Sequence, residues 1–286
     1  MKLTPLASDS MGARSMAFLV ETKDCGILID PGVRLGEIRY GLPPHGIEIE
    51  RRAELWGRIE KAAGKADIAT ISHYHFDHHE PNRPDILWGK RLLVKDPRNN
   101  INRSQRQRAA DFLKILGGRP SSVETADGKT FEIGKTALTF SGAVPHGTDA
   151  RLGYVLELAI SEGEEVFVHT SDVEGPSLDE QADFIVGQDP SVLACDGPMT
   201  YMMHSYGEGA LERSVGNLAR VIGRTKVKDL ILDHHFLRDL KWREKVPGVF
   251  EAAEAHGCRV RTFATFAGEE DDLLEARRKA LFRECP

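Results

Sequence analysis

The sequence contains few cysteines and no long apolar run. None of the four cysteines is part of a CxxC pair, which argues against both a thiolate zinc cage and a disulfide framework. No apolar stretch approaches the ~20 residues that a membrane-spanning helix needs, and residues 1–15 lack the apolar core and cleavage site of a signal peptide. We therefore expect a soluble, cytoplasmic protein whose thiols are reduced: Cys25, Cys195, Cys258 and Cys285.

A strong excess of charge is also absent. The formal net charge is −6 among 286 residues, so no global field attracts nucleic acid, although a local basic patch could still bind it. The length fits one large domain or about two of ~150 residues. No linker favours two, so we predict a single domain over residues 1–286. The eleven histidines are the only feature of the composition that indicates chemistry.

Short apolar strands alternate with helices along the chain, which predicts an α/β fold of mixed sheets with helices outside. Residues 16–20 and 25–29 form a predicted hairpin that ends in an Asp-Pro-Gly turn. The other predicted strands are 68–71, 130–133, 137–140, 154–160, 166–169, 192–195, 230–232 and 260–263, and the predicted helices are 55–63, 211–222, 249–255 and 271–282.

The residues that indicate chemistry most clearly follow the strand 68–71. His73, His75, Asp77 and His78 offer four ligands within six residues, and imidazole and carboxylate groups suit zinc, iron or manganese. The alternative is a solvated loop that is rich in histidine by chance. However, α/β proteins place their sites beyond the carboxyl ends of strands, where this run lies. We therefore predict a metal site here.

The run His73-x-His75-x-Asp77-His78 resembles the HxHxDH signature of the metallo-β-lactamase superfamily. The resemblance extends over about residues 16 to 240. It implies an αββα four-layer sandwich of two mixed sheets with outer helices, and a site with two metal ions. Asp30 resembles the family's first acid, which supports the histidine loop. The resemblance further implies that His73, His75 and His146 bind metal 1, that Asp77, His78 and His234 bind metal 2, and that Asp172 bridges both.

The resemblance implies a metal-dependent hydrolase with two divalent cations, Zn²⁺ first, with Mn²⁺ or iron as alternatives. Two cations ~3.5–4 Å apart lower the pKa of a shared water, so hydroxide can attack an ester, lactone or phosphodiester. His75 replaces the glutamate of the flavodiiron branch, which makes that branch doubtful. No long insertion separates Asp172 from His234, which argues against the β-CASP nuclease architecture.

Two spare histidines, His79 and His235, are catalytic candidates beside Asp77 and Asp172. Imidazole titrates near pH 7, so either could protonate a leaving group, although a spare histidine more often has a supporting or core role. Successive side chains of a strand point to opposite faces. If strand geometry persists beyond residue 232, only one of the adjacent pair can face the metals. The family pattern selects His234.

The substrate is less determined than the fold. We predict a phosphodiester or small phosphorylated substrate, with a lactone or thioester as the alternative. Mono-iron persulfide-type oxidation and a non-catalytic, metal-stapled binding protein are readings of other classes. Basic residues in the pocket would favour phosphate, and an apolar pocket the lactone or thioester. Arg103, Arg106 and Arg108 could contact phosphates, but a solvated face is the usual explanation. The sequence leaves homo-oligomerisation open.

Two loops are candidates for the walls of a pocket. Residues 39–45 could form a substrate-facing lip, with an ordinary surface loop as the alternative. Tyr201, Met202, Met203, His204 and Tyr206 could line a pocket with apolar and polar edges, and packing in the core is equally consistent with their types.

Overall fold

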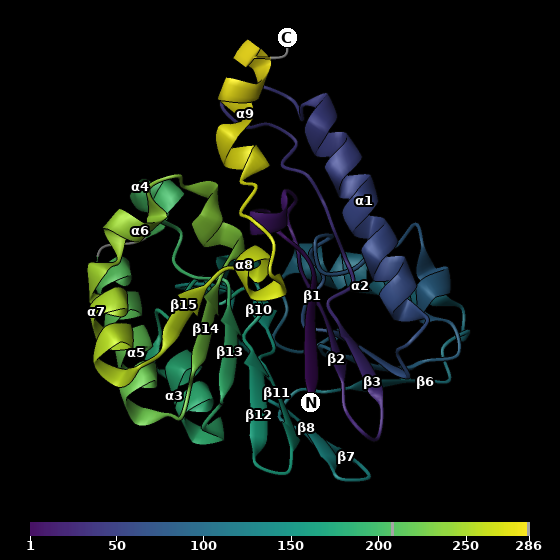
Figure 1. Ribbon diagram of the computed structural model, residues 1–286. Coiled ribbons are helices and arrows are strands. Elements are labelled where there is room, and N and C mark those ends of the chain that lie inside the picture. Colours follow the sequence, from purple (N-terminus) through teal and green to yellow (C-terminus); the bar gives the residue numbers. More distant parts are fainter. Residues whose placement is uncertain (207–208, 285–286) are drawn as a thin grey trace.

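Two mixed β-sheets pack face to face in this chain, as shown by a computed structural model that describes residues 1–206 and 209–284 (Figure 1). The first sheet has the order β1-β2-β3-β4-β5-β6, and the second has the order β15-β14-β13-β12-β11-β8-β7. The strands of the first sheet are β1 (Lys2–Ser8), β2 (Met16–Glu21), β3 (Gly26–Ile29), β4 (Ile68–Ile71), β5 (Arg91–Val94) and β6 (Ser122–Thr125). Those of the second are β7 (Thr130–Ile133), β8 (Thr136–Phe140), β11 (Leu158–Glu162), β12 (Glu165–His169), β13 (Val192–Cys195), β14 (Asp229–Leu232) and β15 (Arg259–Arg261). A short separate ribbon pairs β9 (Val144–Pro145) with β10 (Tyr154–Val155).

Helices cover the outer sides of both sheets (Figure 1). α1 and α2 lie outside the first sheet, and α3, α5 and α7 lie outside the second. This is the αββα arrangement that the resemblance implied. The helices are α1 (Gly46–Ala63), α2 (Arg103–Leu116), α3 (Asp179–Gln188), α4 (Met203–Tyr206), α5 (Ala210–Arg224), α6 (Trp242–Lys245), α7 (Pro247–His256), α8 (Phe263–Ala267) and α9 (Leu274–Glu284). In the ranges that the structure describes, no helix is both long and apolar enough to cross a bilayer.

Alternating side chains divide the apolar residues between two cores. On β11, Leu158 and Ile160 belong to the core between the sheets, whereas Ala159 belongs to the core beneath the outer helices. The rings of Phe18 and Phe167, from β2 and β12, lie 5.0 Å apart and join the two sheets. Full burial of each such large apolar side chain contributes roughly 1.5–3 kcal/mol to folding. The sheets are therefore held as a rigid frame for the loops at their ends.

The parallel strands of both sheets direct their carboxyl ends to one region. β3 and β4 are parallel in the first sheet, and β12, β13 and β14 are parallel in the second. Each of these strands is followed, within three residues of its end, by a charged or imidazole side chain. These residues are Asp30, His73, Asp172, Asp196 and His234.

Several elements differ from the sequence prediction. β1, β5 and β6 were not predicted. β1 contains Pro5 and lies at a sheet edge with an irregular register, where a missing backbone N–H is tolerated. β6 is half exposed, so its sequence lacks a clear apolar pattern. The predicted strand 154–160 is two strands, because the chain leaves the β9–β10 ribbon at Leu156 and joins the second sheet at Leu158. The predicted strand 260–263 ends at Arg261, and α8 begins at Phe263.

The C-terminal helix α9 holds the loop between β3 and α1 in place. The Arg278 guanidinium and the Glu48 carboxylate are fully buried and form a two-pronged ion pair, with both distances 2.8 Å. Arg278 also donates to the Leu42 carbonyl at 3.1 Å, and the Tyr40 hydroxyl donates to the Ala276 carbonyl at 3.1 Å. Removing either partner of the buried pair would leave an uncompensated charge. The loop 30–45 is thus anchored from the end of the chain.

A buried carboxyl group in the connection between β10 and β11 should make stability depend on pH. Glu157 is fully buried, and neither of its side-chain oxygens has a hydrogen-bond partner in the described residues. Burial raises the pKa of Glu157 well above its ordinary value of 4.5, and the Asp196 and Glu180 carboxylates raise it further. A raised folded-state pKa means that the stability is complete below about pH 4.5 and is lost as the pH rises through the folded-state value.

Glu157→Gln should therefore raise the melting temperature, and the gain should grow as the pH rises above the ordinary value of 4.5. Each kcal/mol regained should raise the melting temperature by roughly 2–4 °C. Calorimetric scans of both proteins at rising pH test the prediction. Glu164→Gln, at an exposed position in the turn between β11 and β12, should show no such trend. A difference in melting temperature between wild type and Glu157→Gln that stays the same at every pH would contradict the prediction.

Candidate metal centre

Hydrogen bonds from Ser72 position the loop that follows β4. Its backbone N–H and hydroxyl donate to the Asp30 carboxylate at 2.8 and 2.5 Å. Its carbonyl accepts from the Leu156 N–H at 3.1 Å, where the chain crosses to the second sheet. The loop is therefore held from both sheets, and the side chains after Ser72 project into a fixed volume between their carboxyl ends.

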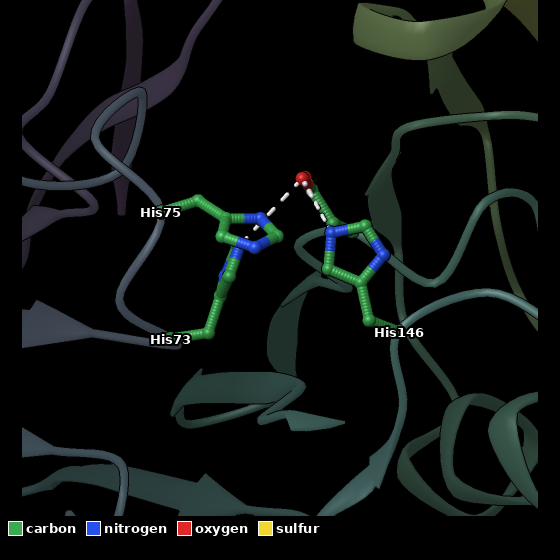
Figure 2. A group of neighbouring side chains, drawn as sticks. His73, His75 and His146 are labelled. Carbon is green, nitrogen blue, oxygen red and sulfur yellow. Dashed lines mark ion pairs between the residues drawn. The ribbon is translucent and has the colours of Figure 1, made fainter. Parts of the chain in front are cut away.

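Four predicted ligands form a first group. The donor atoms of His73, His75, His146 and Asp172 all lie within 4.8 Å of one another. His73 Nε2 is 3.7 Å from Asp172 Oδ2, and His146 Nε2 is 3.3 Å from the same oxygen. Figure 2 shows the labelled imidazoles approaching from two sides, His73 and His75 from one loop and His146 from another. These are the residues predicted for metal 1, together with the predicted bridging carboxylate.

Asp77, His78 and His234 form a second group with the same 4.8 Å limit. Asp172 lies against this group too. Its Oδ1 is 3.1 Å from His78 Nε2, and its Oδ2 is 3.5 Å from His234 Nε2. His234 Nε2 is also 3.6 Å from Asp77 Oδ2. Asp172 therefore contacts both predicted half-sites, which is the position that a bridging ligand needs.

The donor atoms of the two groups fit cations. In the described part of the chain, four buried ligand atoms have no hydrogen-bond partner: His73 Nε2, His78 Nε2, His146 Nε2 and Asp172 Oδ1. A buried polar atom without a partner is costly, and here these atoms converge on one volume. The set consists of imidazole nitrogens and carboxylate oxygens, which suits zinc, manganese or iron.

The histidines of the site differ in pKa: those of His73, His75 and His235 are lowered by burial, whereas those of His78, His146 and His234 are raised. Burial opposes a charge on each imidazole, yet nearby carboxylates, foremost that of Asp172, outweigh it and raise the pKa of His146 to about 10 and that of His234 to about 9. The pKa of His78 is raised well above its ordinary value for the same reason. Burial would raise the pKa of Asp172, but the His78 and His234 charges lower it well below the ordinary range. Metal binding must displace these protons.

Carboxylates lie beside the second ring nitrogens of the two histidines that are predicted to bind metal 2. Asp30 Oδ2 lies 2.9 Å from His78 Nδ1, the kind of support that the resemblance implies for this acid. Asp9 Oδ2 lies 2.8 Å from His234 Nδ1, and Arg238 binds the same carboxylate at 2.9 Å. A carboxylate that accepts the Nδ1 proton leaves Nε2 free to face a metal.

Carboxylates also lie beside the Nδ1 atoms of His235 and His146. Asp196 Oδ2 lies 3.1 Å from His235 Nδ1, and the Asp196 carboxylate also accepts from the backbone N–H groups of Glu174 and Gly175. Glu174 Oε1 lies 3.4 Å from His146 Nδ1. Asp196 therefore fixes both a histidine and the loop that carries Asp172.

Sequence reasoning did not identify Asp9, Glu174 or Asp196 as part of the site. Asp9 follows β1, a strand that was not predicted, so it gave no signal. Asp196 follows the predicted strand 192–195, and a strand-end aspartate was the signal that could have identified it. Glu174 lies two residues after Asp172, and its carboxylate reaches His146 because the chain turns between these two residues.

The premise used to choose between His234 and His235 was wrong. β14 ends at Leu232, and both histidines lie in a 3₁₀ turn, His234–Arg238, that Asp233 caps through the His234 N–H. His234 has a φ of 53°, so strand alternation does not apply. Both side chains face the site, with Nε2 at 3.5 Å for His234 and 3.9 Å for His235 from Asp172 Oδ2. The choice of His234 as the metal ligand stays a prediction.

His79 lies apart from the other predicted residues. It is fully buried, its ring lies 4.7 Å from that of Phe112, and its Nδ1 contacts the His75 carbonyl at 2.9 Å. It does not line the cleft described below. Burial lowers the pKa of His79 to about 4. This arrangement supports a role in positioning His75 rather than the predicted contact with a substrate.

A cleft with two arms opens at the metal centre, and His146, Leu152 and His235 line both arms. The wider arm has a volume of about 770 Å³ and also borders His75, Asp77 and Asp172. Five arginines line it: Arg14, Arg34, Arg52, Arg108 and Arg238. The narrower arm, of about 370 Å³, has an apolar wall that includes Met199 and Met202, and the charged residues Asp149, Arg151 and Glu174 also border it.

The predicted walls of the pocket are partly present. Tyr201 and Met202 line the narrower arm, whereas Met203 and His204 are exposed and Tyr206 is buried. In the loop after β3, the cleft is bordered by residues 34, 35, 37 and 38, just before the predicted lip 39–45. Arg39 stacks on the rings of Tyr40 and Tyr201 at 4.7 Å each, which joins this loop to the narrower arm.

Known proteins resemble this chain in sequence and in fold. No protein-family model matches it. A UPF0282 protein of Korarchaeum cryptofilum is 49% identical over 288 residues, an alignment that covers 100% of this chain and 96% of the relative. The fold is shared with the metallo-β-lactamase fold protein YhfI of Bacillus subtilis, at 15% identity, a TM-score of 0.53, and coverage of 91% of this chain and 95% of YhfI. Unliganded yeast PDE1 is similar at 12% identity, a TM-score of 0.56, and coverage of 91% and 96%. The likeness to solved structures confirms the predicted fold.

Proposed function

The chain belongs to the UPF0282 family and has the metallo-β-lactamase fold, and from this premise we propose that it is a metal-dependent hydrolase with a two-metal centre. The observation that carries the proposal is the position of Asp172, whose two oxygens contact ligands of both half-sites. Two divalent cations, Zn²⁺ first with Mn²⁺ or iron as alternatives, would lower the pKa of a water between them and supply a nucleophile near neutral pH.

A phosphodiester or small phosphorylated molecule is the proposed substrate. The wider arm borders the metal ligands and is lined by arginines, whose planar guanidinium groups suit phosphate oxygens. The chain as a whole carries a net charge of −6, so this concentration of arginine is local. The pocket therefore has the basic residues that favour phosphate over a neutral ester.

The chain's own residues would position the reacting groups. Arg238 is buried between Asp9 and Tyr201 and borders the wider arm, where its charge would face a phosphate near the metals. His235 borders both arms and is backed by Asp196 at 3.1 Å. It is the proposed donor of a proton to the leaving group, because it is the spare histidine that reaches the cleft.

A lactonase or thioesterase is the second candidate, because the narrower arm has an apolar wall. Met199, Met202 and Leu152 could accept an acyl chain beside His146. Readings of other classes fit the site less well. Mono-iron oxidation needs only one group of ligands, whereas Asp77, His78 and His234 provide a second group. A purely structural metal site is usually closed and rich in thiolate, whereas this one contains no cysteine and opens into a cleft.

A substrate panel on metal-loaded protein tests the proposal. Bis(p-nitrophenyl) phosphate, a γ-lactone and an acyl thioester are compared by kcat/KM, with protein stripped by a chelator as the blank. The phosphodiester should exceed the other two by about tenfold or more, since a tenfold preference requires only about 1.4 kcal/mol of differential binding. Turnover of the lactone or thioester with none of the phosphodiester would establish the second candidate instead. Full activity after metal removal would contradict both.

A further inference from the structure

Phe76 is an apolar side chain that protrudes into a charged cleft. It lies between the predicted ligands His75 and Asp77, so its backbone is held at the metal centre. Its side chain is 36% exposed and lines the wider arm. The Arg108 guanidinium lies 4.5 Å from the centre of its ring, and the Arg34 guanidinium lies 5.4 Å from it. Two arginines thus converge on one exposed ring beside the metals.

The arginines near this ring have few carboxylate partners. Arg34 and Arg52 share one carboxylate, Glu80, at 3.0 and 3.7 Å. Arg34 Nε is buried and has no hydrogen-bond partner among the described residues. Arg108 has no carboxylate partner within the part of the chain that the structure describes. Three guanidinium groups on this side of the cleft therefore have one carboxylate partner among them, and the other carboxylates that line the arm are the exposed Glu37 and the predicted ligands Asp77 and Asp172.

The structure separates the arginines that stood together in the sequence. Arg108 is half buried and lines the wider arm, whereas Arg103 and Arg106 are exposed and do not line it. Arg106 instead donates to the Arg98 carbonyl at 3.2 Å. The three arginines therefore form no continuous basic track along α2. A local subsite for one anionic group fits this arrangement, and a long polyanionic strand does not.

We propose that Arg34, Arg52 and Arg108 around Phe76 form a subsite for a second phosphate group of a small substrate, distinct from the phosphate at the metal centre. The proposal rests on the proposed function, since it extends the substrate from a phosphodiester to one that carries a further phosphate. The second phosphate accepts hydrogen bonds from guanidinium groups that have unused donors. The Phe76 ring keeps Arg34 and Arg108 apart and oriented, with cation–π contacts that stabilise both.

The kinetic test compares two esters that differ by one phosphate: thymidine 5′-(p-nitrophenyl phosphate) with and without a 3′-phosphate. Wild type should prefer the 3′-phosphorylated ester by about tenfold in kcat/KM, since charge-assisted hydrogen bonds are about twice as strong as neutral ones. Arg108→Gln should reduce this preference to about threefold or less, and raised salt should reduce it in wild type because the subsite is half exposed. Arg106→Gln, at an exposed position on the opposite side of α2, is the matched control and should keep both the activity and the preference of wild type.

A binding test decides the proposal without turnover. Calorimetry of metal-loaded protein compares thymidine 5′-monophosphate with thymidine 3′,5′-bisphosphate. The bisphosphate should bind about tenfold more tightly to wild type, and Arg108→Gln should lose most of this gain. Arg34→Lys keeps a charge beside Glu80 and so preserves the fold, but it should also lose part of the gain because lysine lacks the planar fork.

The outcomes separate the subsite from the proposed function. Hydrolysis of both esters at equal rates, with equal binding of the two nucleotides, would overturn the subsite and leave the phosphodiesterase intact. Absence of hydrolysis with a bisphosphate gain that depends on Arg108 would overturn the phosphodiesterase and support the anion subsite. Stronger inhibition by an oligothymidylate than by the bisphosphate, at equal phosphate concentration, would show that a nucleic-acid strand occupies the cleft and would overturn the small-molecule assignment.

Discussion

Asp172→Asn should lower the hydrolytic kcat by about a thousandfold, because catalysis by bound cations contributes several kcal/mol to the rate. The carboxylate contacts His73, His78, His146 and His234, so it is the anion common to both half-sites. Asparagine keeps the size of the side chain but removes its charge and one of its two anionic oxygens. Metal content should therefore fall together with activity, and elemental analysis alongside kinetics measures both.

The control for this variant is Asp229→Asn. Asp229 is also buried, but it begins β14 at the end remote from His234 and pairs with Arg259 at 2.6 Å. Its replacement should cost stability without changing the metal content. Both variants should keep the circular dichroism spectrum of wild type. Wild-type turnover by Asp172→Asn, or equal loss in both variants, would remove Asp172 from the proposed role.

Reconstituted wild-type protein should bind two divalent ions per chain, and His234→Ala should bind one. His234 belongs to the group with Asp77 and His78, and its imidazole is oriented by Asp9. Loss of this ligand should empty metal 2 while His73, His75 and His146 still hold metal 1. His235→Ala should retain two ions and lose turnover, since His235 is the proposed proton donor rather than a ligand.

Elemental analysis of the three proteins after dialysis against Zn²⁺ distinguishes the two histidines. One ion in His235→Ala with two in His234→Ala would exchange their roles. A wild-type value of one that does not change with added metal would contradict the two-metal proposal and favour the single-iron alternative. The geometry makes the experiment necessary, because both Nε2 atoms lie within 4 Å of Asp172 Oδ2.

Much of the fold and of the candidate site could be predicted from local patterns. The run from His73 to His78 sits after a short apolar strand, and this local arrangement is encoded within about ten consecutive residues. His146 and Asp172 likewise follow predicted strands. Parallel strands bring such loops to one edge of a sheet, so the sequence alone predicts that loops far apart in the chain lie close together. The groups His73, His75, His146, Asp172 and Asp77, His78, His234 are assembled as the family signature indicated.

The remaining features depend on contacts between distant segments, which no local pattern contains. Asp9 lies against His234 across 225 positions of sequence, and it follows an edge strand that contains a proline and was not predicted. Arg34 and Arg108 converge on Phe76 only because the loop after β3 and the helix α2 flank the same cleft. The direction of His234 and His235 depends on the end of β14 at Leu232, which Asp233 and its partners Ser10 and Phe263 determine. The sequence by itself therefore determined the alternation of strands and helices and the histidine run, since these patterns are local, and the resemblance carried by that run implied the four-layer fold and the remaining candidate ligands. Only the tertiary structure decided the residues that orient those ligands and the charges that face a substrate, since these arise from packing between segments.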